Sequence, residues 1–155
     1  VRSSAASDVY KRQDVNITSG KYSIGTYITG IEPGTGAADF VKNIAVSASG
    51  TVKLLTSSGS ENSGKIATGN KVAVYDASGN LKKTYDIVIY GDINGDGAVN
   101  ALDMIKLNRH ILGKGTLTGA YLEAADANRK RDGGNALDMI IMNRHILGKS
   151  KISQN

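Results

Sequence analysis

The feature that most constrains this chain is an internal repeat near its C-terminal end. The segment Asn-Ala-Leu-Asp-Met-Ile-Lys-Leu-Asn-Arg-His-Ile-Leu-Gly-Lys at 100–114 recurs at 135–149 with only two differences. Within each copy the apolar residues recur at helical spacing, and each copy ends at a glycine followed by a lysine, as helices commonly do. The repeat therefore predicts two equivalent loop–helix units that pack against each other.

An acidic loop that contains glycine precedes the first of these helices. Oxygen-bearing side chains fall at loop positions 1, 3, 5, 9 and 12, with glycine at position 6 and a backbone carbonyl available at position 7. Calcium takes six to eight oxygen ligands, so this spacing predicts a calcium loop of the EF-hand kind; the alternative is a plain acidic turn. The predicted ligands are Asp92, Asn94, Asp96, Ala98, Asn100 and Asp103.

The loop before the second helix is related to the first but departs from its pattern. Its oxygen-bearing residues are Asp126, Asn128, Asp132, Asn135 and Asp138. Three consecutive cations, 129–131, interrupt the loop, and its last aspartate falls one place late. Positive charge beside a divalent ion opposes binding, so we expect calcium in the first loop and a weaker calcium site, if any, in the second.

Residues 14–90 have a different pattern, dominated by short runs rich in β-branched residues and tyrosine. The predicted strands are 15–17, 22–31, 44–48, 51–56, 71–75 and 81–90, with a hairpin loop at 76–80. The segment after Thr35 predicts a capped helix with Ala37, Phe40, Val41 and Ile44 on the sheet. This part gathers no convergent catalytic groups, so we expect a supporting domain; the alternative is a sheet that binds carbohydrate or a partner.

The expected fold class is therefore α+β. A small β-sheet or sandwich-like domain with one short helix (14–90) precedes an all-α calcium-binding domain of two loop–helix repeats (91–155). Residues 1–13 show neither strand nor helix periodicity, and we expect a disordered or artefactual leader there.

Composition excludes several classes of function. The net charge is +5, but lysine and arginine are scattered, so no nucleic-acid surface is expected. The chain has no cysteine and no apolar run long enough to span a membrane. No nucleophile–base pair is evident, so we expect neither an enzyme nor a small-molecule substrate. The two histidines, His110 and His145, are expected to be packing residues, with a shared zinc site as the alternative.

The two repeated helices separate into an inner and an outer side at 100° per residue. The predicted inner side, the mutual core, holds Met104, Ile105, Leu107, Ile111 and Leu112. The predicted outer side holds Leu102, Lys106, Arg109 and Gly113, and in the second copy Leu137, Ile141, Arg144 and Gly148. This outer side predicts a surface for a partner, and the alternative is packing on the β domain.

Residues 91–149 resemble a dockerin, on the evidence of the two calcium loops, the helix after each, and the repeat without a helix before its first loop. The resemblance implies a calcium-dependent module that binds a cohesin, as in the cellulosome-like assemblies through which bacteria degrade polysaccharides outside the cell. It implies a secreted, cell-surface-associated protein. The partner-binding residues that it implies are Ala101, Leu102, Asn108, Arg109 and Gly113, and Ala136, Leu137, Asn143, Arg144 and Gly148.

Because the helices are near-copies, either could present a similar face to the same cohesin. Ile141, in the place of Lys106, is expected to make the second face the more apolar, and this difference and the altered second loop are both expected to bias that choice. The β-rich half resembles the small sheet modules that often precede dockerins. Two other functions stay open: a structural calcium module that packs on its own β domain, and the tail of a glycoside hydrolase whose β domain contacts the glycan.

Overall fold

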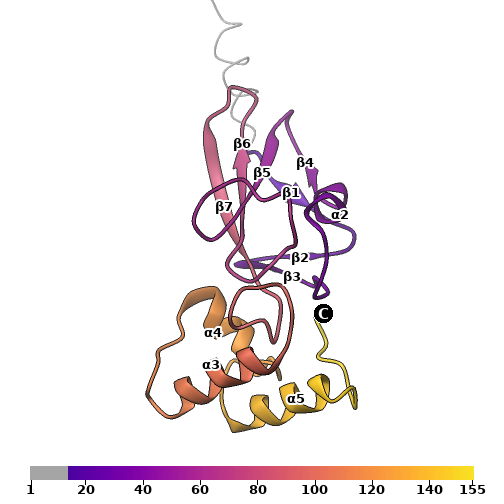
Figure 1. Cartoon of the computed structure of the whole chain (residues 1–155). Coiled ribbons are helices and arrows are strands. Elements are labelled where there is room, and N and C mark those ends of the chain that lie inside the picture. Colours follow the sequence, from indigo (N-terminus) through magenta and orange to yellow (C-terminus); the bar gives the residue numbers. More distant parts are fainter. Residues whose placement is uncertain (1–13) are drawn as a thin grey trace, which may run out of the picture.

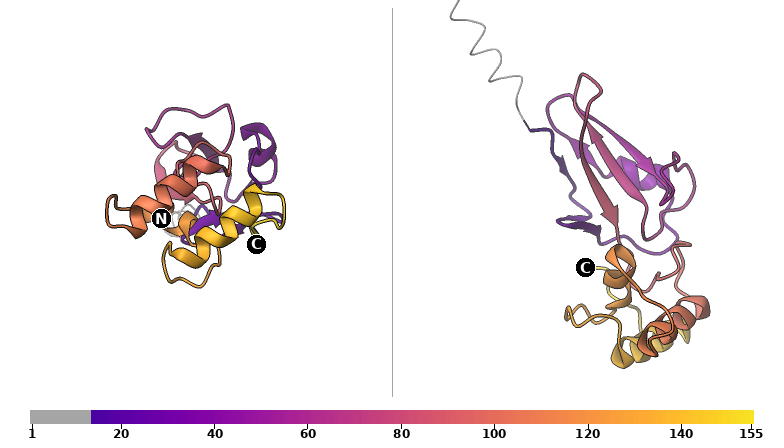
Figure 2. Two further views of the ribbon diagram at one scale, coloured as in Figure 1. Left: turned by 60° about the horizontal axis from the view of Figure 1, so that its bottom comes forward. Right: turned by 90° about the vertical axis from the view of Figure 1, so that its left-hand side faces the viewer.

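The computed structural model describes residues 14–155, so the expectation for residues 1–13 lies outside the described part. Two lobes are stacked end to end: the β module (residues 14–90) and the helical module (residues 91–155) (Figure 1). The right-hand view of Figure 2 shows the same stacking from the side. The α+β class predicted from the sequence is confirmed.

The β module is built on a mixed sheet with the strand order β2-β3-β7-β6-β5. The pair β3–β7 is parallel and the other neighbours are antiparallel. A separate ribbon pairs β1 with β4. The elements are β1 (Ile17–Thr18), β2 (Ser23–Ile24), β3 (Tyr27–Thr29), α2 (Ala37–Lys42), β4 (Ala45–Val46), β5 (Thr51–Leu55), β6 (Lys71–Tyr75) and β7 (Leu81–Ile87).

Two predictions about the elements of this module were wrong, and several predicted strands are longer than the observed ones; the last, predicted over 81–90, ends at Ile87. The run 22–31 is not one strand, because the chain turns at Gly25, whose N–H donates to the Tyr27 carbonyl at 3.0 Å, and β2 then pairs with β3. Helix α2 begins after Gly36 without a side-chain cap, since the Thr35 hydroxyl donates to the Glu32 carbonyl instead, at 2.7 Å. The predicted strand at 71–75 and the hairpin loop at 76–80 are confirmed.

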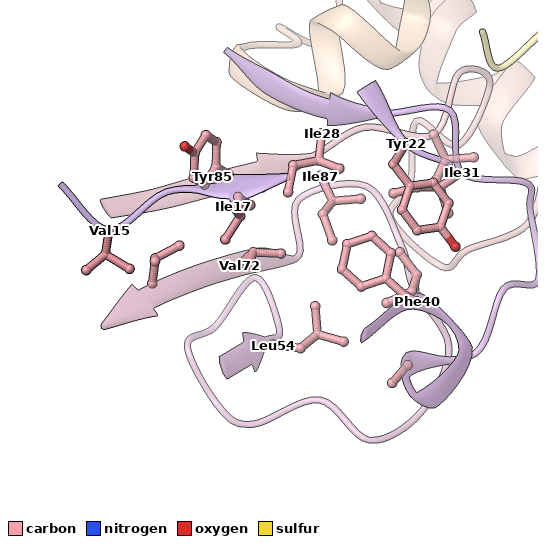
Figure 3. Close-up of a cluster of buried hydrophobic side chains, with 14 residues drawn as sticks. Val15, Ile17, Tyr22, Ile28, Ile31, Phe40, Leu54, Val72, Tyr85 and Ile87 are labelled. Atoms are coloured by element: carbon pink, nitrogen blue, oxygen red, sulfur yellow. The ribbon is translucent and has the colours of Figure 1, made fainter. Parts of the chain in front are cut away.

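The core of the β module lies between the sheet and α2 (Figure 3). Phe40 of α2 is buried and stacks on Tyr22, with the ring centroids 5.0 Å apart. Ala37 is buried beside it, and Ile44 is partly buried against the same cluster. Val41, which was expected to face the sheet, is 39% exposed, because α2 is too short to bury more than one narrow side.

The helical module contains α3 (Ala101–Ile111), α4 (Gly119–Ala125) and α5 (Ala136–Ile146). Helix α3 begins with a capping box in which the Asn100 side chain accepts the Leu102 N–H at 2.8 Å and Asp103 bonds back to the Asn100 N–H. The helix ends at Ile111, and Gly113 beyond it has a φ of 66° that lets the Lys114 N–H return to the Arg109 carbonyl at 2.8 Å. Helix α5 repeats both devices, so local sequence sets both ends of each helix.

The core of the helical module lies between α3 and α5. Leu107 and Met142, the equivalent residues of the two repeats, are both fully buried there, and Met104 is half-buried. Ile111, at the end of α3, is 40% exposed, so its assignment to the inner side was wrong. Ile105 and Leu112 are also exposed, and their assignment to the inner side was wrong too. At 100° per residue both lie closer to Leu102 than to Leu107, and two helices in contact bury only the narrow sides that face each other.

The two modules are joined without a linker. Residues 87–90 alternate between the cores: Ile87 and Ile89 belong to the cluster of the β module, whereas Val88 and Tyr90 belong to that of the helical module. The C-terminal segment returns to this junction, where the buried side chain of Gln154 bonds to both the N–H and the carbonyl of Tyr90, at 2.8 and 2.9 Å. Of the helices described, none is long and apolar enough to cross a membrane.

Candidate functional site

Asp92, the first residue of the first loop, is completely buried. Its Oδ1 accepts the N–H groups of Gly95 and Asp96 at 2.9 and 3.1 Å. Its Oδ2 accepts the N–H of Gly97 at 3.1 Å and that of Thr68, from the β module, at 2.8 Å. The loop is therefore wound around this carboxylate, with Gly95 and Gly97 at φ values of 77° and 78° that favour glycine.

Asp103, the last residue of the loop, is also completely buried and ties the loop to α3. Its Oδ1 accepts the N–H groups of Ile93 and Asn94, both at 2.8 Å, while its Oδ2 accepts that of Asn100. Asp96 is exposed, and its carboxylate accepts hydrogen bonds from the side-chain amides of Asn94 and Asn100 at 2.7 and 3.4 Å. The six predicted ligands thus belong to one closed loop at the start of α3.

The electrostatics of the first loop fit a bound cation. Burial raises the pKa of Asp92 and of Asp103, and each carboxylate also lies in the field of another carboxylate of the loop. Within residues 14–155, no lysine or arginine forms an ion pair with either of them. Burial also acts on Asp96, but the hydrogen bonds from Asn94, Ala98 and Asn100 outweigh it and lower the pKa. Buried acidic oxygens without a cationic side chain are the donor set that calcium binds.

The second loop brings its carboxylates closer together. Asp126, Asp132 and Asp138 place ligand oxygens within 4.8 Å of one another, and among the described residues the first loop forms no such set. Asp126 and Asp138 are buried, Asp132 is exposed, and burial raises the pKa of Asp138. Asn128 and Asn135 are half-buried in the same loop. The three carboxylates among the predicted ligands of the second loop therefore converge, and their chemistry also fits calcium.

The hydrogen bonds show where the second loop differs. The Lys130 N–H donates to Asp126 and to Asn128, which are the bonds that Asp96 makes in the first loop. The Arg131 N–H donates to Asp126 as Gly97 does to Asp92. Lys130 thus takes the backbone place of Asp96, and the extra residue lies between Arg131 and Asn135, where Asp132 supplies the carboxylate.

This arrangement places two arginines where the first loop has glycines. Arg129 and Arg131 have φ values of 56° and 58°, in the left-handed region that only glycine adopts without strain. The second loop also has no counterpart of Val99, because glycines stand at 133 and 134. A Cβ on Gly134 would lie 2.7 Å from Cδ1 of Leu107 and 2.8 Å from the Cβ of Ala125.

The outer faces of α3 and α5 are exposed in the full chain. Leu102 and Leu137 are 58% and 56% exposed, and Leu112 and Leu147 are 57% and 58% exposed. Figure 1 shows α3 and α5 at the end of the molecule away from the β module. We call docking faces the two exposed sets Leu102, Ile105, Arg109 and Leu112 on α3, and Leu137, Ile140, Arg144 and Leu147 on α5.

Ten of the eleven predicted partner-binding residues are exposed. They are Ala101, Leu102, Asn108, Arg109 and Gly113, and Ala136, Leu137, Asn143, Arg144 and Gly148. The exception is Ile141, which is half-buried against the core of the helical module and does not make the second face more apolar. The sequence reasoning missed Ile105 and Leu112 and their counterparts, which a finer helical wheel would have placed beside Leu102 and Leu137.

The two histidines have equivalent roles. The Nδ1 of His110 accepts the Leu117 N–H at 3.2 Å, and that of His145 accepts the Ile152 N–H at 3.1 Å. Both rings are half-buried, as packing residues are, and each holds the chain that leaves its helix.

Tyr90 lies near the second loop; burial and Glu123, which accepts its O–H at 3.1 Å, raise the pKa of Tyr90 to about 12.

Comparison with known families matches residues 90–147 to the dockerin type I domain. This region is a dockerin module. Its repeats, loops and helices are those described above, and dockerins in general are calcium-dependent modules that bind cohesins and have no catalytic role. Dockerin modules occur in extracellular proteins. No curated protein matches the chain.

Proposed function

We propose that this chain attaches a secreted bacterial protein or enzyme to a scaffold of the cellulosome kind, by calcium-dependent binding of its dockerin to a cohesin. In this proposal residues 91–155 are the dockerin, and residues 14–90 are a supporting β module. The observation that carries the proposal is the pair of docking faces, whose equivalent leucines differ in exposure by no more than 2%. Large apolar side chains gathered on an exposed face are typical of a protein–protein interface.

Calcium would be held in the first loop by Asp92, Asn94, Asp96, Ala98, Asn100 and Asp103. In the second loop it would be held by Asp126, Asn128, Asp132, Asn135 and Asp138. The ion supplies positive charge to buried carboxylates that otherwise repel one another. Because Asp103 and Asp138 also close the capping boxes, the order of each loop extends to the start of its helix. The docking faces are then preorganised, which lowers the entropic cost of binding a partner.

The matched faces support two equivalent orientations on the cohesin, related by about half a rotation. The half-burial of Ile141 removes one of the two reasons to expect a bias toward α5, and the altered second loop is the other. The rival function, a structural module that packs its repeat on its own β domain, is not supported, because the faces remain exposed while the β module contacts the first loop, α4 and the C-terminal segment.

The proposal is tested with three full-length variants and a panel of cohesins in calcium. Leu102→Ala with Arg109→Ala removes the face on α3, Leu137→Ala with Arg144→Ala removes the face on α5, and the third variant combines all four changes. If either face suffices, each face variant binds about 2-fold more weakly, because one of two orientations is lost, and the combined variant loses binding. The matched control is Leu81→Ala, on the β module, where the leucine is 56% exposed.

Three results would count against the proposal. Full binding by the combined variant would place the cohesin elsewhere on the chain. Loss of binding in the Leu81→Ala control would mean that the β module carries the contact. A parent chain that binds polysaccharide and none of the cohesins would favour the glycan-contacting tail instead.

A further inference from the structure

One segment of the β module forms a wall of the first calcium loop. A Cβ on Gly97 would lie 2.5 Å from the Ile66 carbonyl, and a Cβ on Gly95 would lie 2.9 Å from the Thr68 carbonyl. On the other side, the Gly34 N–H donates to the Gly97 carbonyl at 2.9 Å. The loop is therefore packed backbone to backbone against the β module, at a distance that only glycine allows.

Within this wall, one backbone group reaches a predicted calcium ligand. The Thr68 N–H donates to Oδ2 of Asp92 at 2.8 Å, in a place where both residues are completely buried. Thr68 lies outside residues 90–147, so this hydrogen bond reaches the loop from beyond the dockerin match.

The position of this N–H group is set by the β module. The Thr68 hydroxyl donates to the Ile89 carbonyl at 3.2 Å and accepts the Ile89 N–H at 3.0 Å. The next residue, Gly69, donates its N–H to the Ile87 carbonyl at 2.9 Å. Thr68 is thus bonded to the chain that leaves β7, and its N–H cannot turn away from Asp92 without breaking these bonds.

The second loop has no equivalent support. Asp126 accepts backbone N–H groups from Lys130 and Arg131, which belong to its own loop, and within residues 14–155 no N–H group of the β module donates to it. The two loops, similar in sequence, therefore differ in what orients their first ligand.

We propose that Thr68 is a positioning residue of the first calcium site, so that the β module raises the calcium affinity of that site and bound calcium in turn stabilises the contact between the two modules. The inference rests on the proposed calcium-dependent function. Groups that hydrogen-bond to metal ligands orient them, and changing such a group typically costs about 10–100-fold in metal affinity. The coupling is reciprocal, because any contact that favours calcium binding is itself favoured by calcium.

The first test compares two changes at Thr68 in the full chain. Thr68→Pro removes the N–H group that faces Asp92, and Thr68→Val keeps it but removes the hydroxyl bonded to Ile89. Both changes are made in a chain that also carries Asp132→Ala, which removes an exposed carboxylate of the second loop and so weakens the second site. Calcium binding to the first site is then measured by titration calorimetry. We expect Thr68→Pro to weaken binding at least about 10-fold, and Thr68→Val, which keeps the N–H group but loses the hydroxyl bonds that hold it in place, to weaken binding by a clearly smaller factor. Equal effects of the two changes, or none, would overturn the inference.

The second test needs no substitution at Thr68, so it does not depend on whether Thr68→Pro folds. Hydrogen exchange of the Thr68 N–H is followed by NMR in the unmodified chain, with calcium and with a chelator. We expect calcium to slow this exchange about 10-fold or more and to leave unchanged the Gly79 N–H, which lies in the remote β6–β7 hairpin and donates to Asp76.

The outcomes separate the inference from the function on which it rests. Calcium binding with unchanged exchange of the Thr68 N–H overturns the inference and leaves the docking function standing. A chain that binds no calcium overturns the proposed function, and the inference with it.

Discussion

The left-handed conformation of Arg131 predicts that glycine is more stabilising than alanine at this position, whereas the opposite order holds at an ordinary loop position. Arg131 occupies the backbone place of Gly97, and their φ values are 58° and 78°. A residue with a Cβ is strained by about 1–2 kcal/mol in this region, and glycine is not. Replacing Arg131 by glycine and by alanine removes the same charge, so the difference between the two variants isolates the backbone strain.

We expect Arg131→Gly to be more stable than Arg131→Ala by about 1 kcal/mol, and the same order at Arg129, whose φ is 56°. For a domain of about this length, 1 kcal/mol corresponds to roughly 2–4 °C in Tm. The assay is thermal unfolding followed by circular dichroism in saturating calcium.

Lys130, between the two arginines, is the matched control because its φ is not in the left-handed region. At Lys130, glycine relieves no strain and only raises the conformational entropy of the unfolded chain. Lys130→Gly should therefore be less stable than Lys130→Ala by about 0.5–1 kcal/mol. The reasoning is refuted if glycine and alanine rank in the same order at Lys130 and at Arg131.

Three further predictions concern stability. Hydrogen bonds from the Asn80 N–H and from Lys82 lower the pKa of Asp76 to about 2, below its ordinary 3.8. The ionised carboxylate therefore stabilises the folded chain above pH 3.8, and this stabilisation is lost as the pH falls through about 2. In Asp76→Asn, the denaturation midpoint should no longer fall with pH over this range. In urea unfolding, Leu107→Ala should lower the free energy of unfolding by about 2–5 kcal/mol because the side chain is fully buried. Leu102 is exposed, so Leu102→Ala should lower it by less than about 0.5 kcal/mol. Gln154→Ala should lower the free energy of unfolding by about 1–3 kcal/mol, because it leaves the buried N–H and carbonyl of Tyr90 without their hydrogen-bond partner.

The helical module was predictable from sequence because its determinants are local. The spacing from Asp92 to Asp103 specifies a loop, Asn100 and Asn135 specify where the helices begin, and the glycine after each helix specifies its end. These features depend only on residues close in sequence, so they can be predicted without knowing the rest of the fold.

The predictions that failed depend on contacts between distant segments. Ile105 and Leu112 are apolar and helical, and only the narrow contact between α3 and α5 decides that they are exposed. The contact of Thr68 with Asp92 spans two modules and leaves no trace in spacing. In the second loop, the cations at 129–131 pointed to a damaged site, but only the hydrogen bonds show that Lys130 replaces Asp96 and that Asp132 supplies the carboxylate.

The most direct test of the central claim is a calcium titration of the purified full chain, followed at the same time by calorimetry and by the helical signal of circular dichroism. If calcium organises the loops that begin α3 and α5, binding releases or absorbs heat, the helical signal rises with occupancy, and a chelator reverses both. A chain that keeps the same helical signal with calcium and with chelator, and gives no heat of binding, would contradict the account.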